Sequence, residues 1–216
     1  DKALQKVPQL TAFQCDITKT RDRDTLYRSI VEQFPDLNML MNNAGITRRY
    51  TFADVDNLEE KIDREWQTNY LAPVMLAKQF LPILINNKGT IVNVTSGLVY
   101  APLSIEPNYC ATKAALHSMT QSMRVQLSDL GVNVREIFYP AVDTPFQDGH
   151  APHFAIQPDV AAAVALKGLN CQKDEIRVKK AGMLFLISRL MPEKSVALIN
   201  RIAKGSPENL SAGESR

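Results

Sequence analysis

Long hydrophobic runs, paired cysteines and a surplus of charge of one sign are all missing from this sequence of 216 residues. No apolar stretch approaches the roughly 20 residues that a helix needs to cross a bilayer. The formal net charge is only +2, which gives no reason to expect a nucleic-acid partner. Cys15, Cys110 and Cys171 are odd in number and lack metal-ligand spacing, so we expect reduced thiols in a cytoplasmic protein.

A glycine-rich turn of the type G-x-G-x-x-G is also absent. In many α/β folds that turn joins a strand to a helix and holds phosphate groups against the helix N-terminus. Hydrophobic residues nevertheless make up 45 % of the chain, which is enough for one core of ordinary size. We expect a single domain over residues 1–204 and a disordered tail over residues 205–216, which are mostly small and polar.

Segments with strand and helix patterns alternate along the chain. Strands are predicted over residues 9–15, 37–41, 89–96, 132–138 and 175–179. Helices are predicted over residues 21–34, 58–86, 107–130 and 158–168, with two more over residues 182–204, separated at Pro192. This alternation is typical of an α/β fold with a parallel sheet, in which ligands bind at the carboxyl ends of the strands.

Three side chains are predicted to meet at one such strand end. Ser96 ends the buried strand, and Tyr109 follows it by thirteen positions. Tyr109 and Lys113 are four positions apart, which places both side chains on the same face of a helix. A hydroxyl, a phenol and an ammonium group are therefore expected to converge on one pocket. The alternative at this point is that Tyr109 and Lys113 belong to an ordinary solvated helix face.

This combination of groups suits proton transfer. A free tyrosine has a pKa of about 10 and is a weak base at neutral pH, but a nearby ammonium group favours the phenolate. We therefore expect Lys113 to lower the pKa of Tyr109, and Ser96 to hold a substrate oxygen where charge develops. The predicted reaction is hydride transfer between a nicotinamide ring and an alcohol or carbonyl carbon, with Tyr109 moving the proton.

Ser96, Tyr109 and Lys113 at this spacing resemble the catalytic signature of the short-chain dehydrogenases/reductases. Further matches to that family are Asp16-Ile17-Thr18, Asn42-Asn43-Ala44-Gly45, Asn69 within the long helix, and Val142-x-Thr144. The runs over residues 42–46, 109–118 and 140–144 resemble its DltE-like subgroup. The resemblance covers residues 9–180 and implies a three-layer, Rossmann-like, doubly wound parallel sheet.

The resemblance also implies roles for single residues. The implied catalytic residues are Asn69, Ser96, Tyr109 and Lys113, with Asn69 bending its helix and orienting a water in a proton relay. The residues implied to bind NAD or NADP are Asp16, Ile17, Asn43, Ala44, Gly45, Tyr109, Lys113, Val142 and Thr144. Tyr139 and Pro140 depart from the usual Pro-Gly of the family, and Pro140 restricts the backbone at the nicotinamide end.

Compared with the family, this sequence lacks the first strand, the first helix and the second strand, roughly fifty residues in all. In the family's strand order 3-2-1-4-5-6-7, both strands would lie between residues 10–15 and 37–41, so the hydrogen bonds on those flanks need other partners. We expect a full-length protein to contain these elements. The alternatives are an inactive truncated fragment, a non-catalytic binding protein of the same family, or a membrane-surface protein that uses its basic C-terminal helices.

The substrate and partners are less closely defined. A small, partly apolar alcohol or carbonyl substrate is indicated by the predicted pocket residues Leu98, Tyr100, Phe146 and Phe154. His150 and His153 lie in a predicted lid over residues 145–156 and lack further ligands, so we expect no metal. We expect the C-terminal helices to cover the pocket rather than contact a membrane. The helices over residues 58–86 and 107–130 are the expected contact of a homo-oligomer.

Overall fold

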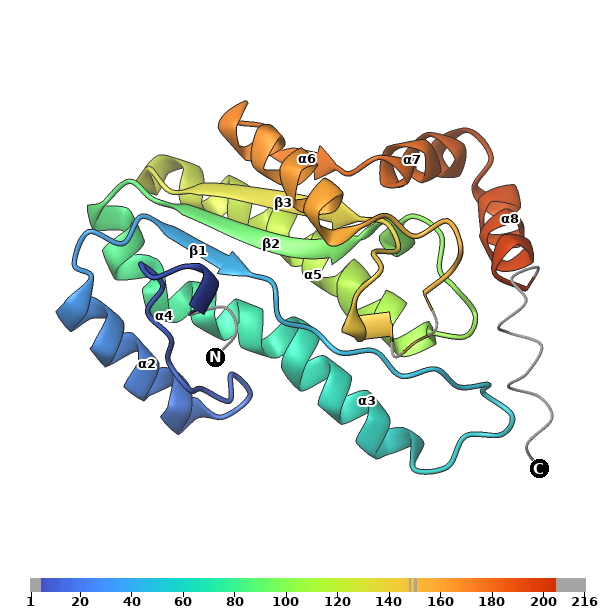
Figure 1. The fold of residues 1–216 in the computed structure, drawn as a ribbon, viewed down its shortest axis with the longest axis horizontal. Coiled ribbons are helices and arrows are strands. Elements are labelled where there is room, and N and C mark those ends of the chain that lie inside the picture. Colours follow the sequence, from blue (N-terminus) through green and yellow to red (C-terminus); the bar gives the residue numbers. More distant parts are fainter. Residues whose placement is uncertain (1–4, 148, 150, 205–216) are drawn as a thin grey trace.

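A four-stranded parallel sheet is the centre of the computed structural model, which describes residues 5–147, 149 and 151–204 (Figure 1). The strands lie in the order β1 (Met39–Asn42), β2 (Thr90–Ser96), β3 (Asn133–Tyr139) and β4 (Glu175–Arg177). Every connection between neighbouring strands contains at least one helix, as parallel pairing requires. The predicted α/β fold is thus confirmed, while the tail predicted over residues 205–216 lies outside the described residues.

The helices follow the predicted segments closely. Their bounds are α2 Thr20–Gln33, α3 Leu58–Trp66, α4 Ala72–Asn86, α5 Pro107–Leu127, α6 Pro158–Asn170, α7 Lys180–Leu190 and α8 Pro192–Lys204. Pro107, Pro158 and Pro192 are each the first residue of a helix. Proline suits that position because its fixed φ is helical and the missing N–H would have no intrahelical partner there.

Strand β2 shows why the sheet lies between two layers. Ile91 belongs to a buried cluster with residues of α4 and α5, among them Phe80. Its neighbour Val92 points to the opposite face and joins a second cluster that contains Leu169 of α6. Successive strand side chains alternate between faces, so a strand covered on both sides needs apolar residues in succession. Helices α4 and α5 therefore cover one face of the sheet and α6 the other, which makes three layers (Figure 1).

Residues 9–15 form no strand, contrary to the prediction. They run as an irregular segment before α2 (dark blue in Figure 1). The ring of Phe13 contacts that of Phe34 at a centroid distance of 6.5 Å, and Ile17 packs against the cluster beneath α4. Apolar contacts therefore hold the segment, but no described strand pairs with it. A polar–apolar alternation becomes a strand only where a neighbouring strand supplies the hydrogen-bond ladder.

A π-helical segment, Gln67–Leu71, joins α3 to α4 and contains Asn69. Pro73 lacks an N–H and cannot donate the regular helical hydrogen bond to the carbonyl of Asn69, four residues earlier. Insertions of this kind widen one turn and redirect the helix. The local break predicted inside the helix over residues 58–86 is therefore present as a π-helical turn.

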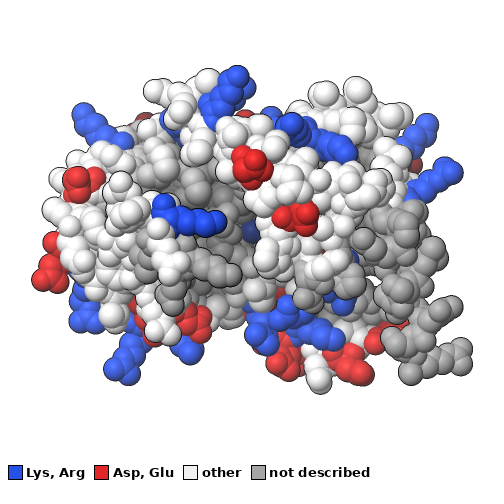
Figure 2. All heavy atoms as spheres, in the orientation of Figure 1, with Lys and Arg blue, Asp and Glu red and all other residues white. Residues whose placement is uncertain are grey.

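The surface carries mixed charge. On the face shown in Figure 2, the described Lys and Arg side chains are interspersed with Asp and Glu. Cys15, Cys110 and Cys171 are all free thiols. A search of the described helices finds no segment both long enough and apolar enough to span a membrane.

Candidate active site

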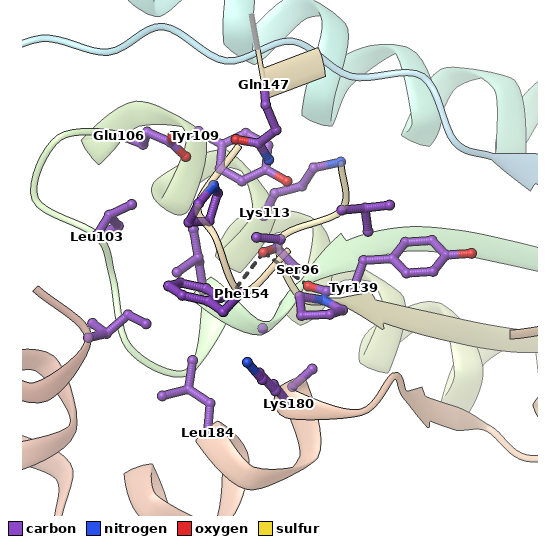
Figure 3. A pocket seen from close by; sticks show the side chains of 18 of the residues that line it. Ser96, Leu103, Glu106, Tyr109, Lys113, Tyr139, Gln147, Phe154, Lys180 and Leu184 are labelled. Carbon is purple, nitrogen blue, oxygen red and sulfur yellow. Dashed lines mark hydrogen bonds between the residues drawn. The ribbon is translucent and has the colours of Figure 1, made fainter. Parts of the chain in front are cut away.

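Ser96, Tyr109 and Lys113 come together at the carboxyl end of β2 (Figure 3). Ser96 is the last residue of that strand, and its hydroxyl accepts a hydrogen bond from the amide of Leu98 at 3.2 Å, which begins a 3-10 turn. Tyr109 and Lys113 lie in the first two turns of α5, which packs against β2 and β3. All three residues are buried, with 6 %, 8 % and 3 % of their surface exposed.

The contacts between these side chains define the geometry of the site. The Ser96 hydroxyl donates to the carbonyl oxygen of Tyr139 at 3.5 Å and lies near enough to the Tyr109 phenol to lower its pKa. The ammonium Nζ of Lys113 lies 5.8 Å from the centre of the Tyr109 ring and donates to the carbonyl oxygen of Val94 at 2.9 Å. The predicted convergence of hydroxyl, phenol and ammonium is therefore present, and the alternative of a solvated helix face is wrong.

The electrostatics of Tyr109 differ from the prediction. Burial raises the pKa of Tyr109 well above its ordinary value, the negative charge of Glu106 raises it further, and the Ser96 hydroxyl lowers it. Burial also lowers the pKa of Lys113 to about 8, against the opposing effect of the negative charge on Glu136. Desolvation is thus the largest effect on both groups. The expected lowering of the Tyr109 pKa is wrong for this structure.

Glu106, Arg49 and Gln147 form a polar wall beside Tyr109 that the sequence analysis did not identify (Figure 3). The Nε of Arg49 lies 3.0 Å from Oε1 of Glu106, and an Nη2 hydrogen donates to Oε1 of Gln147 at 3.3 Å. Glu106 is detectable in the sequence because it immediately precedes Pro107, at the start of the helix that carries Tyr109. Arg49 is not detectable, since it is 57 positions away from Glu106 along the chain.

Asn69 lies behind the cavity rather than in its lining. Its Oδ1 accepts from the amide of Ile46 at 2.8 Å, and its Nδ2 donates to the carbonyl of Ile46 at 2.8 Å and to the hydroxyl of Thr112 at 3.1 Å. Asn69 thereby ties the loop after β1 to α5. The same region is tightly packed at Gly45, where a Cβ would lie 3.3 Å from Oδ1 of Asn69 and 3.5 Å from Nζ of Lys113.

The residues implied to bind a dinucleotide separate into two groups. Asn43, Gly45, Val142 and Thr144 line the same cavity as Tyr109 and Lys113. The chain therefore brings together groups that fit the nicotinamide and ribose end of such a cofactor. Pro140, which restricts the backbone at this end, itself lines the cavity, so the segment around it remains at the site.

The second group, Asp16, Ile17 and Ala44, does not line that cavity. The carboxylate of Asp16 accepts hydrogen bonds from the amide and the hydroxyl of Thr18 at 3.1 and 2.7 Å, and these bonds lower the pKa of Asp16. Ile17 packs against the apolar cluster under α4. The structure thus brings Asn43, Gly45, Val142 and Thr144 to the cavity but leaves Asp16 in a local turn.

The cavity has a volume of about 670 Å³. Its walls include residues of α7 and α8, so these helices cover the pocket as predicted. Leu98, Phe146 and Phe154 line it as predicted, but Tyr100 does not. The Tyr100 ring stacks on that of Phe138 at 5.2 Å, and its hydroxyl accepts from Nε of Arg177 at 3.0 Å. These contacts direct the Tyr100 side chain towards the core and away from the cavity.

Most, but not all, residues of the predicted lid over residues 145–156 are among those that the structure describes. His153 lines the cavity, while His150 and its neighbour Asp148 lie outside the described residues. Residues 141–143 pair with Ile156 through backbone hydrogen bonds of 2.9 and 3.1 Å, which close the segment into a loop. Within the described part of the chain, no group of three or more His, Cys, Asp or Glu side chains is arranged to hold a metal ion.

Glu65 of α3 is fully buried next to this site. Neither carboxylate oxygen makes a well-formed hydrogen bond within the described residues. Burial raises the pKa of Glu65 to about 7 from 4.5, and the charge of Glu106 adds to this, whereas the backbone and charge of Arg48 oppose it. Glu65 is thus an acid whose protonated form the fold prefers.

Replacing Glu65 by Gln is expected to stabilise the protein above pH 7 by roughly 2 kcal/mol, with little effect at pH 4. The unfolded carboxyl ionises near pH 4.5 and the folded one near pH 7, so the unfolded state binds fewer protons between these values. Wild-type stability therefore falls as the pH rises through this range. Urea unfolding at several pH values measures the effect, with Asp63→Asn on the exposed face of α3 as the control. Identical pH profiles for wild type and Glu65→Gln contradict the prediction.

Comparison with known proteins agrees with this site. The short chain dehydrogenase profile matches residues 1–153. The uncharacterized oxidoreductase DltE of Bacillus subtilis is 41 % identical over 144 residues, which cover 66 % of this chain and 57 % of that protein. The short-chain dehydrogenase anuB of Penicillium roqueforti is 34 % identical over 134 residues, which cover 62 % and 45 %.

Among solved structures, a short chain dehydrogenase from Burkholderia cenocepacia in complex with NADP has a TM-score of 0.77 and 25 % identity, covering 91 % of this chain and 82 % of that one. The chain spans about half the length of the curated relatives it matches. The match to the profile covers well over half of the chain. The parallel sheet, the serine at the end of β2 and the helix with Tyr109 and Lys113 are consistent with that match. The chain belongs to the short chain dehydrogenase family.

Proposed function

We propose that this protein is an NAD- or NADP-dependent oxidoreductase that transfers a hydride between the cofactor and the carbon of a carbonyl compound or alcohol. The observation that carries the proposal is the meeting of Ser96, Tyr109 and Lys113, all three buried, at one largely apolar cavity. The NADP complex of the Burkholderia cenocepacia protein supports the cofactor class.

The cofactor end of the site is proposed on the first group of lining residues. Asn43, Gly45, Val142 and Thr144 would hold the nicotinamide and ribose portion, beside Tyr109 and Lys113. A bound nicotinamide dinucleotide would supply or accept the hydride. Glycine suits position 45 because a Cβ there would lie 3.3 Å from Oδ1 of Asn69 and 3.5 Å from Nζ of Lys113.

The proton chemistry follows from the two hydroxyl groups. Ser96 and Tyr109 can both donate a hydrogen bond to one carbonyl oxygen, which stabilises the negative charge that develops on it. Because its pKa is raised, Tyr109 holds its proton until that oxygen becomes basic, and then transfers it. The ammonium of Lys113 then stabilises the phenolate that is left. Ser96, Tyr109 and Lys113 are themselves buried, which strengthens these interactions.

Asn69 is proposed as a positioning residue. Its side-chain amide uses both hydrogens to hold Ile46 and Thr112, so it fixes the loop after β1 relative to α5. Pro73 has no N–H to donate to the backbone carbonyl of Asn69, so this carbonyl is suited to orient a water.

A second copy of the chain is proposed to pack on α3–α4 and α5, where Leu71, Met75 and Val125 are 40 %, 40 % and 77 % exposed.

A non-catalytic binding protein of the same family is the second candidate. It is favoured by the position of Asp16 and Ile17, which lie away from the cavity that holds Tyr109. Only the first candidate predicts both cofactor binding and turnover.

Binding of NADPH or NADH is expected to raise the melting temperature of the protein purified from its native cells. A ligand at 100 times its Kd stabilises the folded state by about 2.7 kcal/mol, which corresponds to a shift of several degrees. Differential scanning fluorimetry measures the shift, with adenosine as the control ligand. A panel of ketones, aldehydes and alcohols followed by reduced-cofactor absorbance then tests turnover. No shift with either cofactor contradicts the first candidate, and a shift without turnover favours the second.

A further inference from the structure

We infer that the part of the cavity under α7 and α8 binds an unbranched hydrocarbon chain, and that the substrate is a medium-chain ketone, aldehyde or alcohol. The position of the reacting carbon in this inference rests on the proposed function. The binding of the chain does not, because it depends only on the walls of the cavity.

The walls of this region are mainly apolar. From α7 and α8 they contain Met183, Leu184, Ile187, Leu198, Ile199 and Ile202. From the loops opposite they contain Leu98, Leu103, Ile105, Phe146 and Phe154. On α7 the lining positions recur every three or four residues, so one face of the helix points into the cavity. That face borders a hollow instead of packing into the core.

Much of this apolar surface is open to solvent. Met183 is 57 % exposed, and Leu198 and Ile202 are each 41 % exposed, although all three line the cavity. Ligand sites are typically concave, mainly apolar and of several hundred Å³, with a few polar groups that orient the ligand. The region under α7 and α8 has this character, and the orienting groups, Ser96 and Tyr109, lie in the same cavity.

Both helices are fixed in place over the site. A Cβ at Gly97, the residue after Ser96, would lie 3.2 Å from the Cβ of Ala181. The first turn of α7 therefore packs directly on the 3-10 turn that follows Ser96. On α8, Asn200 accepts from the amide of Ser104 at 2.7 Å and donates to the carbonyl of Pro102 at 3.0 Å. The apolar walls are therefore held against the Ser96 turn and against the loop before α5.

The polar side chains of the cavity interact with one another or with an aromatic ring. The region proposed to hold the hydrocarbon chain therefore stays mainly apolar. Glu106 pairs with Arg49, and Gln147 accepts from the same guanidinium group. The ammonium of Lys180 lies 4.9 Å from the centre of the Phe154 ring. In Figure 3, Leu184 and Lys180 approach Ser96 from the side opposite to Tyr109 and Glu106. A chain attached to a carbonyl held by Ser96 and Tyr109 would thus extend along α7.

A series of methyl ketones from butanone to undecanone tests the substrate class. Each methylene that enters an apolar site is expected to raise kcat/KM about fourfold until the chain fills the region. Leu184→Asp is expected to abolish this dependence on chain length. Leu186→Asp is the matched control, because Leu186 lies on the same helix but is 59 % exposed and does not line the cavity. It is expected to keep the wild-type dependence.

Binding of a fluorescent fatty-chain probe, measured without cofactor, separates this inference from the proposed function. We expect the probe to bind wild type and Leu186→Asp alike, and Leu184→Asp at least about tenfold more weakly. That result supports the chain site even if no ketone is reduced. Equal binding to all three proteins, or a kcat/KM independent of chain length, overturns the inference and leaves the proposed hydride transfer standing.

Discussion

Replacement of Tyr109 by Phe is expected to lower kcat/KM by about a thousandfold, the typical contribution of a positioned acid–base group. The phenol lines the same cavity as Ser96, and its raised pKa, caused mainly by burial, keeps the proton on it until the substrate oxygen becomes basic. Phenylalanine keeps the ring and its contact with Phe146, at a centroid distance of 5.7 Å, but removes the proton. The affinity for reduced cofactor should therefore change by no more than about threefold, since the apolar contacts persist.

The control for this variant is Tyr100→Phe. It also removes one phenol hydroxyl, which accepts a hydrogen bond from Arg177, but Tyr100 does not line the cavity. Tyr100→Phe should lose about 1 kcal/mol of stability with its one hydrogen bond and keep its turnover, whereas Tyr109→Phe should lose turnover. Steady-state kinetics and cofactor titration on both proteins provide the comparison. Turnover within about tenfold of wild type in Tyr109→Phe would falsify the assignment of the proton donor.

Replacement of Lys113 by Met is expected to lower kcat/KM at least about a hundredfold, because nothing then stabilises the phenolate of Tyr109. The same change should leave the protein as stable as wild type at pH 7, or more stable by about 1–2 kcal/mol. Lys113 is 3 % exposed, and burial lowers its pKa from 10.5 to about 8. The folded state therefore bears the cost of an ammonium group with little hydration.

The pH dependence gives the sign of this effect. Between pH 8 and 10.5 the unfolded state holds a proton on this lysine that the folded state has lost, so wild-type stability rises with pH in that range. Met removes the group, so the advantage of the variant at pH 7 should shrink towards pH 10. Chemical denaturation at both pH values tests this. A variant that is inactive and also several kcal/mol less stable at pH 7 contradicts the prediction, since its loss of activity would then reflect unfolding.

The comparison of expected and observed elements shows where local pattern suffices. Pro192 separates α7 from α8 as expected, because proline cannot continue a hydrogen-bonded helix from the preceding turn. Tyr109 and Lys113 share a face of α5 because four positions make about one helical turn. The segment over residues 9–15 shows the limit of such patterns. Its alternation resembles that of a strand, but the partner that would make it one is not specified by the segment itself.

The site divides in the same way. Motifs and spacing along the chain were enough to predict the family, the α/β class and the meeting of Ser96, Tyr109 and Lys113, because strand ends share one edge of a parallel sheet. The rise in the pKa of Tyr109 and the pairing of Arg49 with Glu106 could be found only in the folded chain. Desolvation and long-range contacts depend on which distant segments surround a group, and no spacing along the chain contains that information.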